Sequence, residues 1–120
     1  MADSLSLPIY RTTYVFTKEI MTITSKFPRN FKFILGDRLC RDSVALLVQL
    51  ARINRLHSDK VVEIDDFLAI LDAVRMQISL ANDMHILTVR QLARLIPFIA
   101  DIQTQAMAWR KYQRGKGVSK

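Results

Sequence analysis

The chain has 120 residues, of which 50% are hydrophobic, and this length suits a single domain with one core. Its 18 Lys and Arg against 11 Asp and Glu give a formal charge of +7, which excludes an acidic solvating segment and favours a polyanionic partner. Three Gly, three Pro and one Cys argue against collagen-like or turn-rich all-β designs and against a disulfide framework, so a reducing compartment is expected.

The sequence shows no signal for a membrane. No run of about 18 apolar residues is present, so no membrane-spanning segment is predicted. The first ten residues, MADSLSLPIY, lack the basic and apolar regions of a secretory signal. We therefore expect a soluble cytoplasmic protein with no membrane partner.

Apolar residues recur at steps of three and four along the chain, which is the spacing of amphipathic helices and not the alternation of a half-buried strand. The seam positions are Thr13, Phe16, Ile20, Ile23, Phe27; Leu35, Leu39, Leu46, Leu50, Ile53; Ile64, Phe67, Leu71, Val74, Ile78, Ala81; and Leu92, Leu95, Ile99, Ile102, Ala106, Trp109. They predict helices at about residues 9–27, 30–56, 60–82 and 88–113.

The fold class predicted from these helices is all-α. Because short connections make sequential helices antiparallel neighbours, we expect an up-down-up-down four-helix bundle over residues 9–114. A partly disordered lead at residues 1–8 precedes it, and a flexible basic tail at residues 115–120 follows.

Local signals mark the breaks between the helices. Pro28 disfavours helical geometry before it, so the first helix should end there, with Asn30 available to cap the second. Ser58 or Asp59 can cap the third helix.

The fourth helix carries two further signals. Thr88 with Gln91 three residues later is a capping-box pattern. Pro97 lies inside this helix and predicts a kink, because it removes one backbone hydrogen bond.

The predicted second helix has more apolar surface than a bundle interior needs. Beside its core-facing arc lies a second apolar arc with Cys40, Val44, Leu47 and Ala51. This arc is either a thicker core under the first and fourth helices or a subunit interface. Gly36 supports a close approach, because an interior helical glycine costs about 1 kcal/mol against alanine. The candidate oligomer interface is therefore Gly36, Cys40, Val44, Leu47 and Ala51.

Cations gather on the opposite arc of the same helix. Arg38, Arg41, Arg52 and Arg55, called the basic ridge below, project from nearly one face. Arg29 and Lys32 extend the ridge to the start of the helix, where a cation opposes the macrodipole by about 0.3–1 kcal/mol. The ridge is either an evenly solvated surface or a phosphate-facing one, and the net charge favours the second interpretation.

The last predicted helix is also basic. Its candidate nucleic-acid-binding residues are Arg90, Arg94, Arg110, Lys111 and Arg114. Bases in a last turn also complement the helix dipole, so the final three have a structural explanation as well. Trp109 follows the seam and is better explained as a core residue than as a base-stacking platform.

No catalytic constellation is visible. His57 and His85 fall in predicted loops without a metal-ligand spacing, and Cys40 lies on an apolar arc. No H-E-x-x-H, Walker loop or G-x-S-x-G elbow occurs. The two glutamates, Glu19 and Glu63, are too few for a di-metal carboxylate site. We therefore expect no enzyme activity, no metal and no cofactor.

Several segments, in this order and spacing, resemble a known family. They are Leu7-Pro8-Ile9-Tyr10, the run SKFPRNFKFILGDRL with its Phe27-Pro28-Arg29 junction and Leu35-Gly36, and FIADIQTQAMAW followed by Arg110 and Lys111. Over residues 7 to about 114 the chain resembles the four-helix-bundle ribosomal-RNA intervening-sequence proteins. It is more similar still to their relatives, the accessory variability determinant (Avd) proteins of diversity-generating retroelements.

This resemblance implies a basic homopentamer of four-helix protomers. It also implies binding to the element's reverse transcriptase and to template RNA or DNA, in support of mutagenic retrohoming. The sequence thus favours a non-catalytic, nucleic-acid-binding accessory protein of a retroelement. The alternative is an oligomeric scaffold of the intervening-sequence type that recruits a protein partner.

Overall fold

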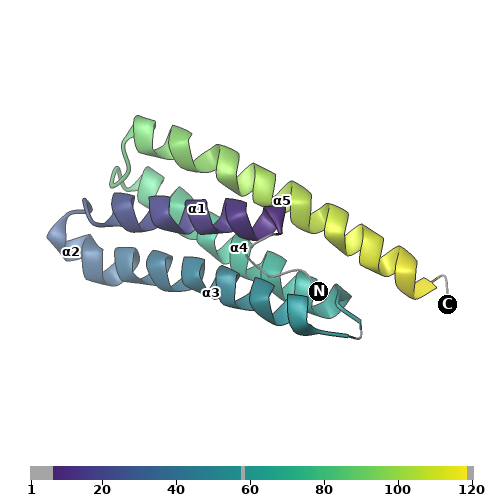
Figure 1. The fold of residues 1–120 in the computed structure, drawn as a ribbon. Helices are drawn as coiled ribbons and strands as arrows, with labels where there is room; N and C mark the ends of the chain where they lie inside the picture. Colours follow the sequence, from purple (N-terminus) through teal and green to yellow (C-terminus); the bar gives the residue numbers. More distant parts are fainter. Residues whose placement is uncertain (1–6, 58, 119–120) are drawn as a thin grey trace.

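The computed structural model describes residues 7–57 and 59–118, with side chains as far as residue 116. Within these ranges the chain is helical, with four long helices and no strand (Figure 1). The long helices are α1 (Pro8–Thr24), α3 (Asp37–Arg55), α4 (Val61–Asp83) and α5 (Val89–Val118). The single turn α2 (Arg29–Phe31) and the π-helical turn η2 (Lys32–Gly36) lead directly into α3.

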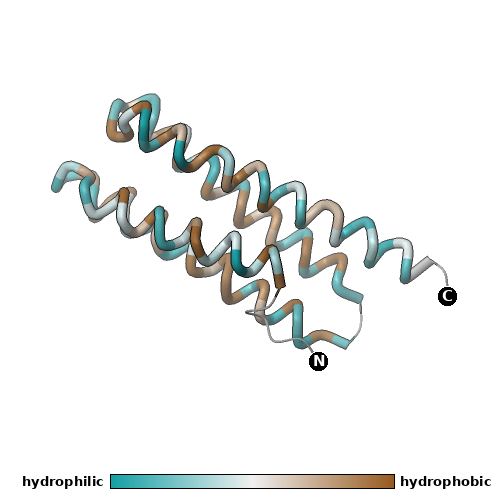
Figure 2. Tube along the Cα trace, turned by 45° about the horizontal axis from the view of Figure 1, so that its top comes forward, coloured by the Kyte–Doolittle hydropathy of each residue, from teal (hydrophilic) through white to brown (hydrophobic). Residues whose placement is uncertain are grey.

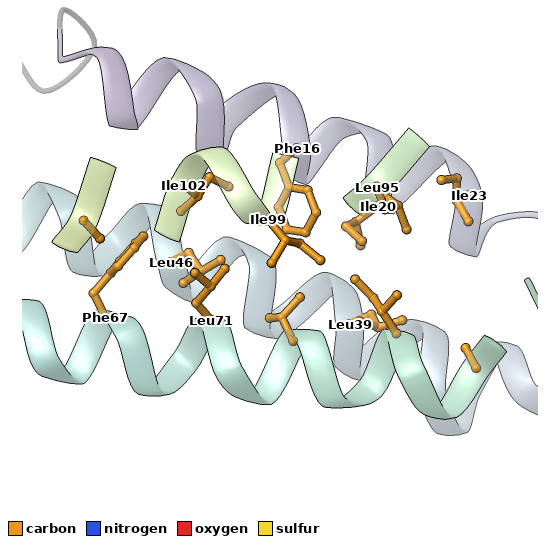
Figure 3. Packing of buried hydrophobic residues seen from close by; sticks show 14 of the residues in the cluster. Phe16, Ile20, Ile23, Leu39, Leu46, Phe67, Leu71, Leu95, Ile99 and Ile102 are labelled. Carbon is orange, nitrogen blue, oxygen red and sulfur yellow. The ribbon is translucent and has the colours of Figure 1, made fainter. Parts of the chain in front are cut away.

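The four long helices enclose one core. α1 packs against α3 and α5, and α4 packs against the same two helices. Hydrophobic and hydrophilic stretches alternate along every helix (Figure 2), as a one-sided seam requires. Figure 3 shows Phe16, Leu46, Leu71 and Ile99, one from each long helix, directed into the same interior. The seam positions are all buried except Leu92 and Trp109, which are half-buried and pack against the core.

α1 ends three residues earlier than the predicted last residue, 27. The α-helix ends at Thr24, and the N–H groups of Lys26 and Phe27 donate to carbonyl oxygens three residues back, at 3.0 and 3.1 Å. These tighter bonds close the last turn before Pro28. The expected cap at Asn30 is wrong, because Pro28 holds the capping position and Asn30 lies inside α2 without a side-chain cap bond.

The second helical segment contains a π-helical turn that the sequence did not predict. A π-helix arises when one extra residue is inserted into a helix, and a 3.6-residue periodicity does not detect it. A Cβ atom added to Gly36 would lie 3.4 Å from Thr24 Cβ and 3.5 Å from Phe27 Cδ2. These are ordinary van der Waals distances, so η2 lies against the end of α1 without requiring glycine at this position.

The predicted cap at Asp59 is displaced by one residue, because Lys60 holds the capping position of α4 and makes no side-chain cap bond. Asp59 Oδ1 still accepts a hydrogen bond from the N–H of Val61 at 2.9 Å, and Ser58 lies outside the described residues. The capping box is confirmed: the N–H of Thr88 donates to Gln91 Oε1 at 2.9 Å, and the N–H of Gln91 donates to Thr88 Oγ1 at 3.0 Å. The helix continues through Pro97.

The last helix extends beyond the predicted end near residue 113. α5 continues to Val118 and projects past the start of α4 (Figure 1). A glycine ends a helix by adopting positive φ, and no described glycine does so. At the other terminus, Pro8 is already helical, and residues 1–6 lie outside the described part of the chain.

His85 terminates α4 in a left-handed conformation, with a φ of 60°. Its N–H donates to the carbonyl of Asn82 at 3.0 Å, and the N–H of Ile86 donates to the carbonyl of Ala81 at 2.9 Å. These two hydrogen bonds together define the Schellman motif. Glycine is the residue that fits the left-handed position of this motif with least strain. Ile86 and Ala81 are both buried, so the motif also joins this turn to the core.

We expect the His85→Gly substitution to raise the free energy of unfolding by roughly 1 kcal/mol, because glycine removes the strain of a Cβ atom at positive φ. Urea denaturation followed by circular dichroism measures the change. His57→Gly is the matched control, since His57 is exposed and lacks positive φ. Equal or opposite effects of the two substitutions would contradict this account of the turn.

Candidate nucleic-acid interface

The basic ridge lies on the outer face of α3, and all four of its arginines are exposed. Arg38, Arg41 and Arg55 make no ion pair with a carboxylate among the described side chains. Arg52 Nη2 lies 3.6 Å from Glu63 Oε1, but the Arg52 side chain is still 64% exposed. An exposed pair of this kind is worth about 0–1 kcal/mol, so it competes weakly with a phosphate for the guanidinium.

The cations predicted to extend the ridge lie at one end of the bundle. Arg29 in α2 and Lys32 in η2 are exposed, and no acidic residue occupies the first turn of either element. Arg90, exposed at the start of α5, belongs to the same end, because the α4–α5 turn and α2 both lie at that end of the bundle (Figure 1). None of these three cations pairs with a carboxylate in residues 7–57 or 59–116.

Two of the nominated arginines instead join helices. Arg94 Nε donates to Glu19 Oε1 at 2.7 Å and links α5 to α1. Arg110 donates to both carboxylate oxygens of Asp65, at 2.5 Å from Nε and 3.3 Å from Nη2, and links α5 to α4. Sequence reasoning missed both links, because their partners lie 75 and 45 residues away and no local pattern reports them.

The Arg110–Asp65 contact perturbs both groups. The hydrogen bond from Arg110 holds the pKa of the Asp65 carboxyl below its ordinary value, and the positive charges of Arg110 and Arg114 act in the same direction. The same bond raises the pKa of Arg110. Arg114 and Lys111 are exposed, so only the first of the three terminal cations serves a structural link here.

The candidate oligomer interface divides into two parts. Gly36 and Cys40 pack toward α1, with Cys40 Sγ 3.1 Å from Thr24 Oγ1, and so thicken the core. Val44, Leu47 and Ala51 line an open groove of about 680 Å³ together with Tyr10 and other residues. Val48, which the sequence interpretation omitted, also lines this groove and is 63% exposed. The subunit interface stays a prediction for this second part.

The remaining nominated groups have simple environments. Trp109 is half-buried and packs against the core, as the seam predicted. His57 and His85 are exposed. No group of three or more His, Cys, Asp or Glu side chains among the described residues is placed to hold a metal ion. No helix in the described part of the chain has both the length and the apolar character needed to cross a membrane.

Comparison with known proteins adds no assignment. No protein-family model matches the chain, and no curated protein matches its sequence. The resemblance to the accessory variability determinant family therefore depends on the quoted sequence segments.

The Asp65–Arg110 pair gives a pH prediction. Because the pKa of Asp65 is lower in the folded chain than its unfolded value near 3.9, the pair stabilises the fold above that value. This contribution is lost as the pH falls through the folded pKa. We expect Asp65→Asn to lower the melting temperature more at about pH 7 than at about pH 2.

Thermal unfolding followed by circular dichroism at both pH values measures this difference. Asp66→Asn is the control, because Asp66 is exposed and makes no ion pair with a described side chain. The pH account would be wrong if Asp65→Asn destabilised the protein equally at the two pH values, or if Asp66→Asn reproduced its effect.

Proposed function

We propose that this chain is a non-catalytic accessory protein of a diversity-generating retroelement that binds the backbone of RNA or DNA. The observation that carries the proposal is how exposed the eleven candidate cations are and whether they pair with carboxylates. Eight of them are exposed and make no ion pair with a carboxylate among the described side chains. These eight are Arg29, Lys32, Arg38, Arg41, Arg55, Arg90, Lys111 and Arg114.

Electrostatics explains why the partner is a nucleic acid. A net charge of +7 attracts any polyanion, and unpaired guanidinium groups on a helix exterior match phosphate oxygens. Contacts of this type position the protein on the backbone and carry little sequence information. We therefore expect strong salt dependence and weak sequence preference.

We also propose that the four long helices run antiparallel, up-down-up-down. In each pair of neighbouring helices, two contacts support this direction, because the residue numbers rise along one helix as they fall along the other. Along α1 and α3, Thr24 meets Cys40 and Thr17 bonds to the carbonyl of Ser43. Along α3 and α4, Gln49 bonds to Glu63 and Gln77 to Asp42. Between α5 and α1, Arg94 bonds to Glu19 and Gln105 bonds to Thr12. Between α5 and α4, Gln103 contacts Arg75 and Arg110 bonds to Asp65.

The proposed partners and assembly rest on the family resemblance. They are the element's reverse transcriptase, template RNA or DNA and further copies of this chain in a homopentamer, in the cytoplasm and in support of mutagenic retrohoming. The open groove lined by Val44, Leu47 and Ala51 supports self-association, because it leaves apolar surface without cover in one chain. Arg52 and Arg55 also line this groove, so self-association there would cover that end of the basic ridge.

The ridge gives a direct test. If roughly six phosphates are neutralised, the logarithm of affinity falls with the logarithm of salt concentration with a slope near −5. Replacing all four ridge arginines by alanine should weaken that slope by about 3 to 4 and abolish retention at moderate salt. Labelled single-stranded and duplex RNA and DNA, measured in gel shifts over a salt series, give the slope.

A control variant removes the same number of charges elsewhere. Arg11, Lys18, Lys26 and Lys60 were not nominated, and their replacement by alanine should leave most of the binding intact. Helix content by circular dichroism shows whether each variant folds. Equal losses in the two variants would remove the ridge from the proposal. No shift by the natural chain even at low salt would favour the protein-recruiting scaffold instead.

A further inference from the structure

Phe33 is placed unlike every other phenylalanine in the chain. The side chains of Phe16, Phe27 and Phe67 are buried, and those of Phe31 and Phe98 are half-buried. Phe33 is 67% exposed on the π-helical turn η2, next to Ile34, which is 73% exposed. Two adjacent large apolar side chains in water contribute nothing to the core, so a role in binding accounts for them better than a role in folding.

The exposed ring borders a polar hollow at the start of the basic ridge. This hollow has a volume of about 530 Å³, and its lining residues are Phe33, Ile34, Asp37, Arg38, Arg41 and Asp42. Its size falls in the range of about 300–1,000 Å³ found for pockets that hold small molecules. The hollow therefore has room for a planar group stacked on the ring beside two ridge arginines.

The charges around the hollow favour an anionic ligand. Arg29 and Lys32 precede the ring, and Arg38 and Arg41 follow it; none of them pairs with a carboxylate among the described side chains. Of the two carboxylates in the hollow, Asp42 Oδ2 accepts a hydrogen bond from Gln77 Nε2 of α4 at 2.6 Å. Within the lining, Arg38 and Arg41 balance Asp37 and Asp42, so the excess positive charge at this end of the ridge comes from Arg29 and Lys32 in the preceding turns.

From this arrangement we infer that Phe33 is a stacking platform for an unpaired base of single-stranded nucleic acid. A single strand alternates flat base faces with phosphates, and sites that bind it combine exposed aromatic rings with neighbouring cations. In a duplex the base faces are already stacked and do not reach the ring. π-helical turns also occur frequently at functional sites. The inference rests on the proposed nucleic-acid binding and adds a preference for single strands.

The neighbouring aliphatic surface suggests a protein as the competing ligand. Met76 and Leu80 on α4 are 71% and 50% exposed and line an adjoining groove of about 740 Å³ with Ile34. A protein partner would cover these side chains together with Phe33. The cations on both sides of Phe33 favour the strand, and the experiment below separates the two.

The test uses three variants of the full chain: Phe33→Ala, Phe33→Leu and Phe33→Trp. Their affinities are measured by fluorescence anisotropy for a labelled single-stranded RNA of mixed sequence, the same strand with abasic positions, and a duplex. We expect Phe33→Ala and Phe33→Leu each to weaken binding to the intact strand about 10-fold, and Phe33→Trp to preserve it. Leucine keeps the apolar volume but lacks the aromatic face, so it isolates stacking.

Binding to the abasic strand and the duplex should change less than 3-fold in all three variants, because neither presents a free base. In Phe33→Trp the intact strand should also quench the new indole fluorescence, with the natural chain and its Trp109 as the background. Circular dichroism checks that each variant folds. We expect all three to fold, because the exposed Phe33 side chain is not part of the core.

The outcomes separate the two proposals. If the natural chain binds no strand, the proposed function fails and the inference fails with it. If the natural chain binds but Phe33→Ala and Phe33→Leu bind equally well, the inference alone is overturned. It is also overturned if those two variants change the oligomeric state in sedimentation while strand affinity stays the same, because Phe33 would then belong to a protein interface.

Discussion

Burial of one apolar seam fixes how each helix is turned about its axis, and the surface chemistry follows from that. In α3, Leu46, Leu50 and Ile53 are completely buried. With about 100° between successive residues, that orientation turns Arg41 and Arg55 to the opposite side of the helix. Burial of the seam alone places the ridge arginines on one exposed face, and this placement needs no stabilising contact made by the arginines. The seam therefore leaves the ridge available for binding.

Cations of the same type have different roles, and the difference depends on the neighbouring helix. Arg94 and Arg110 face Glu19 and Asp65 across a helix boundary and join two helices. Arg38, Arg41 and Arg55 face no such carboxylate among the described side chains. The joined arginines use their charge to link helices, whereas the unpaired ones retain theirs for a ligand.

Signals that act within one helical turn were predictable, and those that depend on distant segments were not. The seam and the Thr88–Gln91 capping box depend on spacings of three and four residues, and both appear in the structure. The arginine links depend on which helices become neighbours, and no pattern within one helix reports that. The continuation of α5 past Gly115 is a local exception, because glycine adopts helical and left-handed φ about equally readily. A single sequence gives no direct measure of any of these.

The exposed ring shares its hollow with Arg38 and Arg41, the first two arginines of the basic ridge. Arg38 and Arg55 are seventeen residues apart on α3, about 26 Å at 1.5 Å per residue. At about 3.4 Å per nucleotide in a stacked strand, that length matches roughly seven phosphates, close to the number assumed for the salt slope. Phe33 lies just before the first of these arginines, so a base stacked on it would place the following phosphates along the ridge. A backbone ridge alone holds a strand in many sliding registers, whereas one stacking platform at its end would fix where the strand begins.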